Sequence, residues 1–116
     1  MRYQDHETGD TVPLEFAVSA VVEHDYKALR DVLDAAYDQA AYGKGKKRHA
    51  RNNPFHEQHM QSISRLLDSD AGMAFQVVKK LTEGLDMVDF EARERELLGA
   101  IVYLAGIVVY WRGGGS

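Results

Sequence analysis

The sequence contains no cysteine among its 116 residues. This absence excludes a disulfide framework, a thiolate zinc site, an iron–sulfur cluster and a cysteine nucleophile. Any metal would have to be held by histidine and carboxylate side chains. The sequence predicts no resident metal and no cofactor.

Long apolar runs are also scarce. The first ten residues are polar, so we expect no cleavable signal and infer a cytoplasmic protein. The longest apolar run, residues 97–111, has fifteen residues, fewer than the about 18 that suggest a membrane span. We therefore expect a buried helix there and no membrane association.

The composition that is present is typical of a globular protein, with 45% hydrophobic and 28% charged residues. The length suits one domain, which we place at residues 1–112. The last four residues, 113–116, read Gly-Gly-Gly-Ser and are interpreted as a flexible tail or linker.

Charge is distributed unevenly along the chain. Residues 1–43 carry a net charge of −6, residues 44–56 carry +5 with no acid, and residues 57–116 carry −3. Affinity for duplex nucleic acid usually comes with a basic domain or a long basic stripe, so a single basic island argues against it. The island fits the size of a small polyanion such as a nucleotide.

Hydrophobic spacing predicts a mainly all-α protein of about four helices. We expect helices at 25–42, at 54–67 after the Asn53-Pro54 start signal, from Ser69 or Asp70 to Gly84, and at 90–112. Residues 11–22 fit a short strand or an extra helix equally well. The side chains expected to face the core are Tyr26, Leu29, Val32, Leu33, Ala36, Ala40, Phe55, Met60, Ile63, Leu66, Leu67, Ala74, Val77, Val78 and Leu81.

The last helix is apolar on every side over residues 97–111. Another element must cover it, so we expect either a central helix or a homo-oligomer interface, and we favour the oligomer. Gly99 and Gly106 lie one heptad apart and would let another helix approach closely. The alternative is a strand at Ile107–Val109.

The basic loop is the main candidate site. Its cations, glycines and asparagines lie just before a helix start, where backbone N–H groups and the helix dipole favour an anion. The spacing does not match a phosphate-binding Walker loop. A solvated loop without a ligand carries about equal weight. The candidate ligand-binding residues are Lys44, Lys46, Lys47, Arg48, His49, Arg51, Asn52, Asn53, His56 and Gln58.

Two metal sites are weaker alternatives. His56 and His59 lie three residues apart rather than the four of a zincin helix, and would need a third ligand. Glu91 and Glu94 share a helix face and could hold magnesium, with Asp86 nearby. The simpler interpretation is that Glu91 and Glu94 form the charged start of a buried helix.

Residues 98–105, preceded by Glu94 and Glu96, resemble the closing helix of the all-α nucleoside triphosphate pyrophosphohydrolases of the MazG type. In that magnesium-dependent family an Asp that ligates metal follows the glycine, whereas this chain has Ala100. The paired Glu-x-x-Glu and Glu-x-x-Asp motifs of the family are separated by a dozen or more residues, whereas the nearest pairs here, Glu83/Asp86 and Glu91/Glu94, lie too close together and in reversed order. The resemblance implies a helical nucleotide binder that has lost its catalytic metal site.

The stretch from Gly43 to Tyr110 resembles small accessory proteins of tailed bacteriophages. Together these features predict a non-catalytic, oligomeric phage protein that sequesters a phosphate-bearing signal such as a cyclic oligonucleotide. A diverged magnesium-dependent nucleotide pyrophosphohydrolase is the enzyme alternative. A protein inhibitor of a host enzyme, with acidic helices mimicking nucleic acid, is the third.

Overall fold

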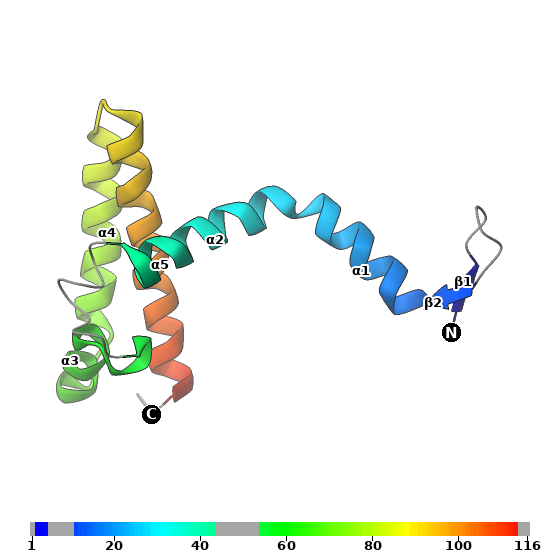
Figure 1. Cartoon of the computed structure of the whole chain (residues 1–116). Coiled ribbons are helices and arrows are strands. Elements are labelled where there is room, and N and C mark those ends of the chain that lie inside the picture. Colours follow the sequence, from blue (N-terminus) through cyan, green and yellow to red (C-terminus); the bar gives the residue numbers. More distant parts are fainter. Residues whose placement is uncertain (1, 5–10, 44–53, 114–116) are drawn as a thin grey trace. The chain divides into compact units, whose positions relative to one another are not determined.

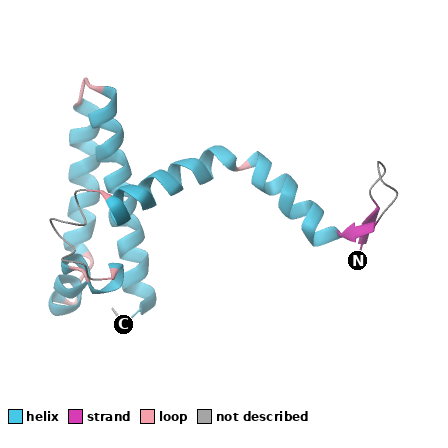
Figure 2. Ribbon diagram, in the orientation of Figure 1, coloured by secondary structure: helices cyan, strands magenta, loops and turns pink. Residues whose placement is uncertain are grey.

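Helices make up most of the chain that the structure, a computed structural model, describes: residues 2–4, 11–43 and 54–113, with side chains from 18–43 and 54–113. The predicted all-α class is confirmed, apart from one small hairpin (Figure 2). In that hairpin β1 (Arg2–Gln4) pairs antiparallel with β2 (Thr11–Pro13). The chain divides into two compact units, residues 1–32 and 33–116.

In the first unit, residues 11–22, which fit a strand or a helix by sequence, contain parts of both. Strand β2 ends at Pro13, and α1 (Leu14–Asp25) begins at the next residue. Helix α2 (Lys27–Tyr42) follows after Tyr26, so the predicted helix at 25–42 is confirmed within two residues. All side chains described between residues 18 and 32 are exposed. The prediction that Tyr26, Leu29 and Val32 face a core is therefore wrong.

The second unit is built on an antiparallel helical hairpin of α4 (Ala71–Asp86) and α5 (Phe90–Gly113), which lie side by side along most of α4 (Figure 1). Met87 has an extended backbone and ends α4. The Asp89 carboxylate accepts the Ala92 backbone N–H at 2.9 Å, which caps the start of α5. Both predicted helices are confirmed, and the alternative strand at Ile107–Val109 is wrong.

The helix expected at 54–67 is interrupted. A 3-10 turn, η2 (Phe55–Glu57), comes first, Gln58 is extended, and only then does α3 (His59–Leu67) begin. The prediction of one continuous helix is wrong because Gln58 leaves the helical region with a ψ of 166°. Helix α3 ends at Asp68, which adopts the left-handed conformation (φ 52°) that aspartate tolerates better than most residues.

The core of the second unit is small and lies around the α4–α5 hairpin. Its buried apolar side chains are Ala36, Met73, Leu98, Ala100 and Tyr110, and its buried polar ones are Gln61 and Ser64. Many residues expected in the core are exposed instead, because they lie on helix faces that no described element covers: Leu33, Ile63, Leu66, Leu67, Val78 and Leu81. Only Ala36 is fully buried among the predicted core residues.

Helix α5 is neither a central helix nor bare on all sides. It buries Leu98, Gly99, Ala100, Gly106 and Tyr110, and it exposes Leu104, Val108 and Trp111. The two glycines do permit a close approach, but the elements that approach are α3 and α4 of the same chain. An added Cβ would lie 3.1 Å from Lys80 Cδ at Gly99 and 3.0 Å from Met73 Sδ at Gly106.

In the described part of the chain, α5 is the one helix that is long and apolar enough, by length and composition, to cross a membrane. Polar groups contact it at three levels. Lys80 packs beside Gly99, Gln61 donates to the Gly106 carbonyl, and the Asp70 carboxylate accepts the Trp111 indole N–H at 2.9 Å. These contacts favour a helix packed against polar elements of its own unit, because such groups are costly in hydrocarbon.

Candidate functional site

An open pocket of about 1060 Å³ lies within the second unit. It is bounded by the end of α2, by η2 and α3, and by one face of the α4–α5 hairpin. Ligand pockets commonly enclose about 300–1,000 Å³, so this pocket has room for a nucleotide-sized molecule. The polar or charged side chains that line it are Gln39, Gln58, His59, Ser64, Gln76, Lys80, Arg95 and Tyr103.

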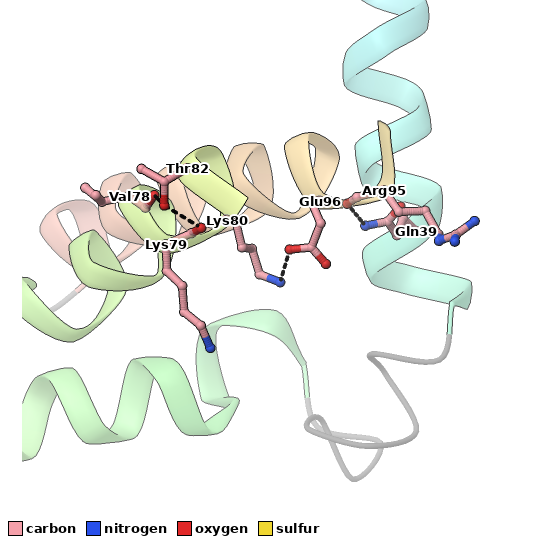
Figure 3. A network of polar contacts seen from close by, with 7 residues as sticks. All are labelled: Gln39, Val78, Lys79, Lys80, Thr82, Arg95 and Glu96. Carbon is pink, nitrogen blue, oxygen red and sulfur yellow. Dashed lines mark hydrogen bonds and ion pairs between the residues drawn. The ribbon is translucent and has the colours of Figure 1, made fainter. Parts of the chain in front are cut away.

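Lys80 is the most constrained cation of the pocket. Its aliphatic stem lies over Gly99, where the missing side chain leaves the space that the stem occupies. Its ammonium group reaches Glu96 Oε2 at 3.6 Å (Figure 3). The same group lies 5.9 Å from the centre of the Tyr103 ring. The side chains of Lys80 and Glu96 are 27% and 28% exposed, so the pair is only partly shielded from water.

The hydroxyl of Tyr103 is held in its neutral form. Partial burial raises the pKa of Tyr103 above its ordinary value, because the phenolate would lose hydration there. The neutral hydroxyl can donate a hydrogen bond to a ligand oxygen across the physiological pH range.

Arg95 supplies a cation that no carboxylate of residues 18–43 and 54–113 pairs with. Its backbone carbonyl accepts the Gln39 side-chain amide at 3.0 Å, which ties the end of α2 to the start of α5 (Figure 3). The guanidinium group extends past Gln39, away from the Lys80–Glu96 pair. A guanidinium can bind phosphate through two parallel hydrogen bonds.

Eight of the ten sequence-predicted site residues lie outside the described residues: Lys44, Lys46, Lys47, Arg48, His49, Arg51, Asn52 and Asn53. Gly43, directly before that segment, and Phe55, two residues after it, both line the pocket.

The other two predicted site residues differ in their position relative to the pocket. Gln58 lines the pocket, whereas His56 is not among the lining residues. The imidazole of His56 lies 3.8 Å from the Glu57 carboxylate, and its backbone carbonyl accepts Arg65 Nη1 at 3.1 Å. The expectation that His56 and Gln58 extend one anion site of the basic loop stays a prediction.

Sequence reasoning missed the pocket cations on α4 and α5. Arg95 lies between Glu94 and Glu96, and Lys80 follows Lys79 with Glu83 three residues further on, so the sequence favours a solvated helix face for each. The signal that could have located Lys80 is Gly99, because a glycine inside an apolar helix indicates close approach by a neighbour. That approach was assigned to another chain, whereas the neighbour is Lys80.

The described residues hold no group of three or more histidine, aspartate or glutamate side chains that could bind a metal. Glu91 and Glu94 are both exposed, and Glu96 is paired with Lys80. Within these residues, neither the histidine pair nor the glutamate pair belongs to a group of three or more such side chains.

Comparison with protein-family profiles, with curated proteins and with solved structures finds no match to this chain.

Proposed function

We propose that the protein binds a small phosphate-bearing ligand, such as a cyclic oligonucleotide, and sequesters it without turnover. The observation that carries this proposal is the pocket lined by Gly43 and Phe55, which stand directly before and two residues after the basic segment 44–53. That segment holds five cations and no acid, and the pocket has the size that a nucleotide needs. Sequestration in the cytoplasm of an infected cell, as an anti-defence protein of a phage, is the biological role we attach to it.

The chemistry of the pocket supports an anionic, partly aromatic ligand. Arg95 offers a guanidinium for phosphate, Lys80 adds positive potential, and Tyr103 and Phe55 offer apolar ring surface. Bases stack on aromatic rings while phosphates pair with arginine, so one nucleotide could use both.

Native mass spectrometry with a panel of cyclic and linear nucleotides, with and without magnesium, tests the proposal. We expect intact nucleotide to be recovered from the complex after denaturation. Recovery of a cleaved nucleotide would replace the proposal with the pyrophosphohydrolase. Absence of binding across the panel would rule out both and leave the host-enzyme inhibitor, which a pull-down from host lysate would test.

Variants locate the site once a nucleotide binds. Arg95→Gln removes a charge-assisted hydrogen bond to phosphate, so we expect affinity to fall by roughly 10- to 100-fold. Arg112→Gln is the matched control, because Arg112 lies on the same helix but does not line the pocket. The triple change of Lys46, Lys47 and Arg48 to Gln should abolish binding while leaving the melting temperature nearly unchanged. Unchanged affinity in both Arg95→Gln and the triple variant would place the site elsewhere.

A further inference from the structure

The face of the α4–α5 hairpin opposite the pocket is apolar, and no described element of the second unit covers it. On α4, the spacing of Val78, Leu81 and Leu85 places them on one side of the helix, with exposed fractions of 59%, 44% and 51%. We call this set, together with a second set on α5, the outer apolar face.

The α5 set consists of Leu104, Val108 and Trp111, which are 51%, 40% and 62% exposed. At 3.6 residues per turn, each set lies roughly 160° around its helix from the residues that line the pocket. Because the pocket residues of both helices share one face of the hairpin, both sets share the other face.

The outer apolar face has the residue spacing of a helical-bundle seam. Positions 74, 78, 81 and 85 on α4 and positions 97, 101, 104, 108 and 111 on α5 alternate steps of four and three. Each of these nine positions holds Ala, Val, Leu, Ile or Trp, with no charged or polar residue. Such a repeat packs against other helices with the same spacing, as in four-helix bundles.

We infer that this face is the interface of a homodimer, in which two α4–α5 hairpins stack to form a four-helix bundle. The six half-exposed side chains offer roughly 500–600 Å² of apolar surface, at the upper limit of what a monomer exposes. This area is the greater part of the about 800 Å² that each partner buries in a standard interface.

A second copy is favoured over another partner for two reasons. The face carries no charge that would select an acidic or basic partner, whereas two identical apolar stripes related by a two-fold axis are self-complementary. The buried apolar core of the second unit is also small, since Met73 is its only large apolar side chain less than 2% exposed among the described residues. Stacking two hairpins would add the missing core.

The single tryptophan of the chain reports on this interface without a mutation. Trp111 belongs to the outer apolar face, and we expect its fluorescence emission to shift to the blue as the wild-type protein is concentrated from about 10 nM to about 100 μM. Sedimentation over the same range should show a monomer becoming a dimer. A monomer at every concentration, or a dimer with unchanged Trp111 emission, would overturn the inference.

Paired variants test the location. Leu81→Lys with Leu104→Lys places two charges on the outer apolar face and should weaken dimerisation by roughly 100-fold or more. Leu66→Lys with Leu67→Lys is the matched control on α3, where those side chains are 83% and 65% exposed, and it should leave the dimer intact. A dimer in the first variant as strong as in the wild type contradicts the inference.

Two further results distinguish loss of folding from loss of dimerisation, and a second copy of the chain from a membrane. If the first variant unfolds, the wild-type melting temperature decides, because it rises with protein concentration only when the folded state is a dimer. A monomeric wild type whose Trp111 emission shifts on adding lipid vesicles would assign the face to a membrane and overturn the inference. Nucleotide affinity is measured separately, so failure of the dimer leaves the proposed ligand site standing.

Discussion

Gln61 joins three helices through one side chain that is only 1% exposed. Its amide nitrogen donates to the Gly106 carbonyl on α5 at 2.8 Å and lies 3.9 Å from Met73 Sδ on α4. A buried amide is tolerated only when its polar atoms have partners, and here the glycine gives the amide access to the α5 backbone. Gln61 therefore fixes the position of α3 on the hairpin.

Gln61→Glu tests this role by exchanging the amide nitrogen for oxygen. At pH 7 the carboxylate would face the Gly106 carbonyl without a donor, and we expect the free energy of unfolding to fall by about 2–4 kcal/mol in urea titrations. Burial raises the folded pKa of the introduced carboxyl above its unfolded value of about 4.3. The loss should therefore be small below pH 4 and grow as pH rises through that value.

Gln76→Glu is the control for the added charge, because Gln76 is half-buried and lines the open pocket. It should change stability by less than about 1 kcal/mol at pH 7. Equal effects of the two substitutions would show that the Gln61 contact does not matter.

The end of α5 is held by acidic residues at the α3–α4 turn. Trp111 donates its indole N–H to the Asp70 carboxylate at 2.9 Å. Burial raises the pKa of the Tyr110 hydroxyl, and the Asp68 and Asp70 carboxylates raise it further. Tyr110 therefore stays neutral well above neutral pH.

At the scale of elements, two glycines of α4 have opposite surroundings. A Cβ added at Gly84 would lie 3.0 Å from Glu96 Cβ, an atom fixed to the α5 backbone. A Cβ added at Gly72 would meet nothing within 4 Å. Gly84 therefore sets the spacing of the hairpin, while Gly72 only weakens its helix.

Alanine substitutions should separate these roles. Gly72→Ala should raise the free energy of unfolding by up to about 1 kcal/mol, because alanine favours the helix. Gly84→Ala makes the same gain but forces α5 outward, so we expect a net loss of about 1–2 kcal/mol. Urea unfolding followed by circular dichroism measures both. A stabilising Gly84→Ala would show that the hairpin yields without cost.

The sequence predicted the positions of the helices more accurately than it predicted which side chains are buried. The spacing and capping signals placed α2, α4 and α5 within about two residues, because these signals are local. Apolar spacing also marked Leu66 and Val78 as core residues, although both are exposed. Spacing shows which residues share a face but not whether a second element covers it. For the same reason the pocket cations Lys80 and Arg95, which come from separate helices, were not predicted.

At the scale of the whole molecule, the pocket and the outer apolar face lie on opposite sides of one hairpin. A dimer formed through the outer apolar face would therefore leave both pockets open to ligand. Since the two surfaces share no residue, ligand affinity should not depend on the dimer. The proposed function and the proposed interface can thus be tested independently.

The two units should also differ in local stability. The side chains described between residues 18 and 32 are all exposed, so little buried apolar surface opposes opening of α1. The α4–α5 hairpin packs along its length around Met73, Leu98 and Ala100. In hydrogen–deuterium exchange followed by mass spectrometry, we expect peptides from α1 to exchange within seconds and peptides from the middle of α5 to stay protected at least about 100-fold longer.

Raising the protein concentration sharpens this comparison. If hairpins pair through the outer apolar face, protection of α5 should increase with concentration while exchange in α1 stays the same, since association stabilises only the elements that it buries. Equal protection of α1 and α5 at all concentrations would mean that α1 is covered by a partner surface. In that case the exposed apolar side chains of α1, Val18, Val21 and Val22, rather than those of α4 and α5, would form the interface of the assembly.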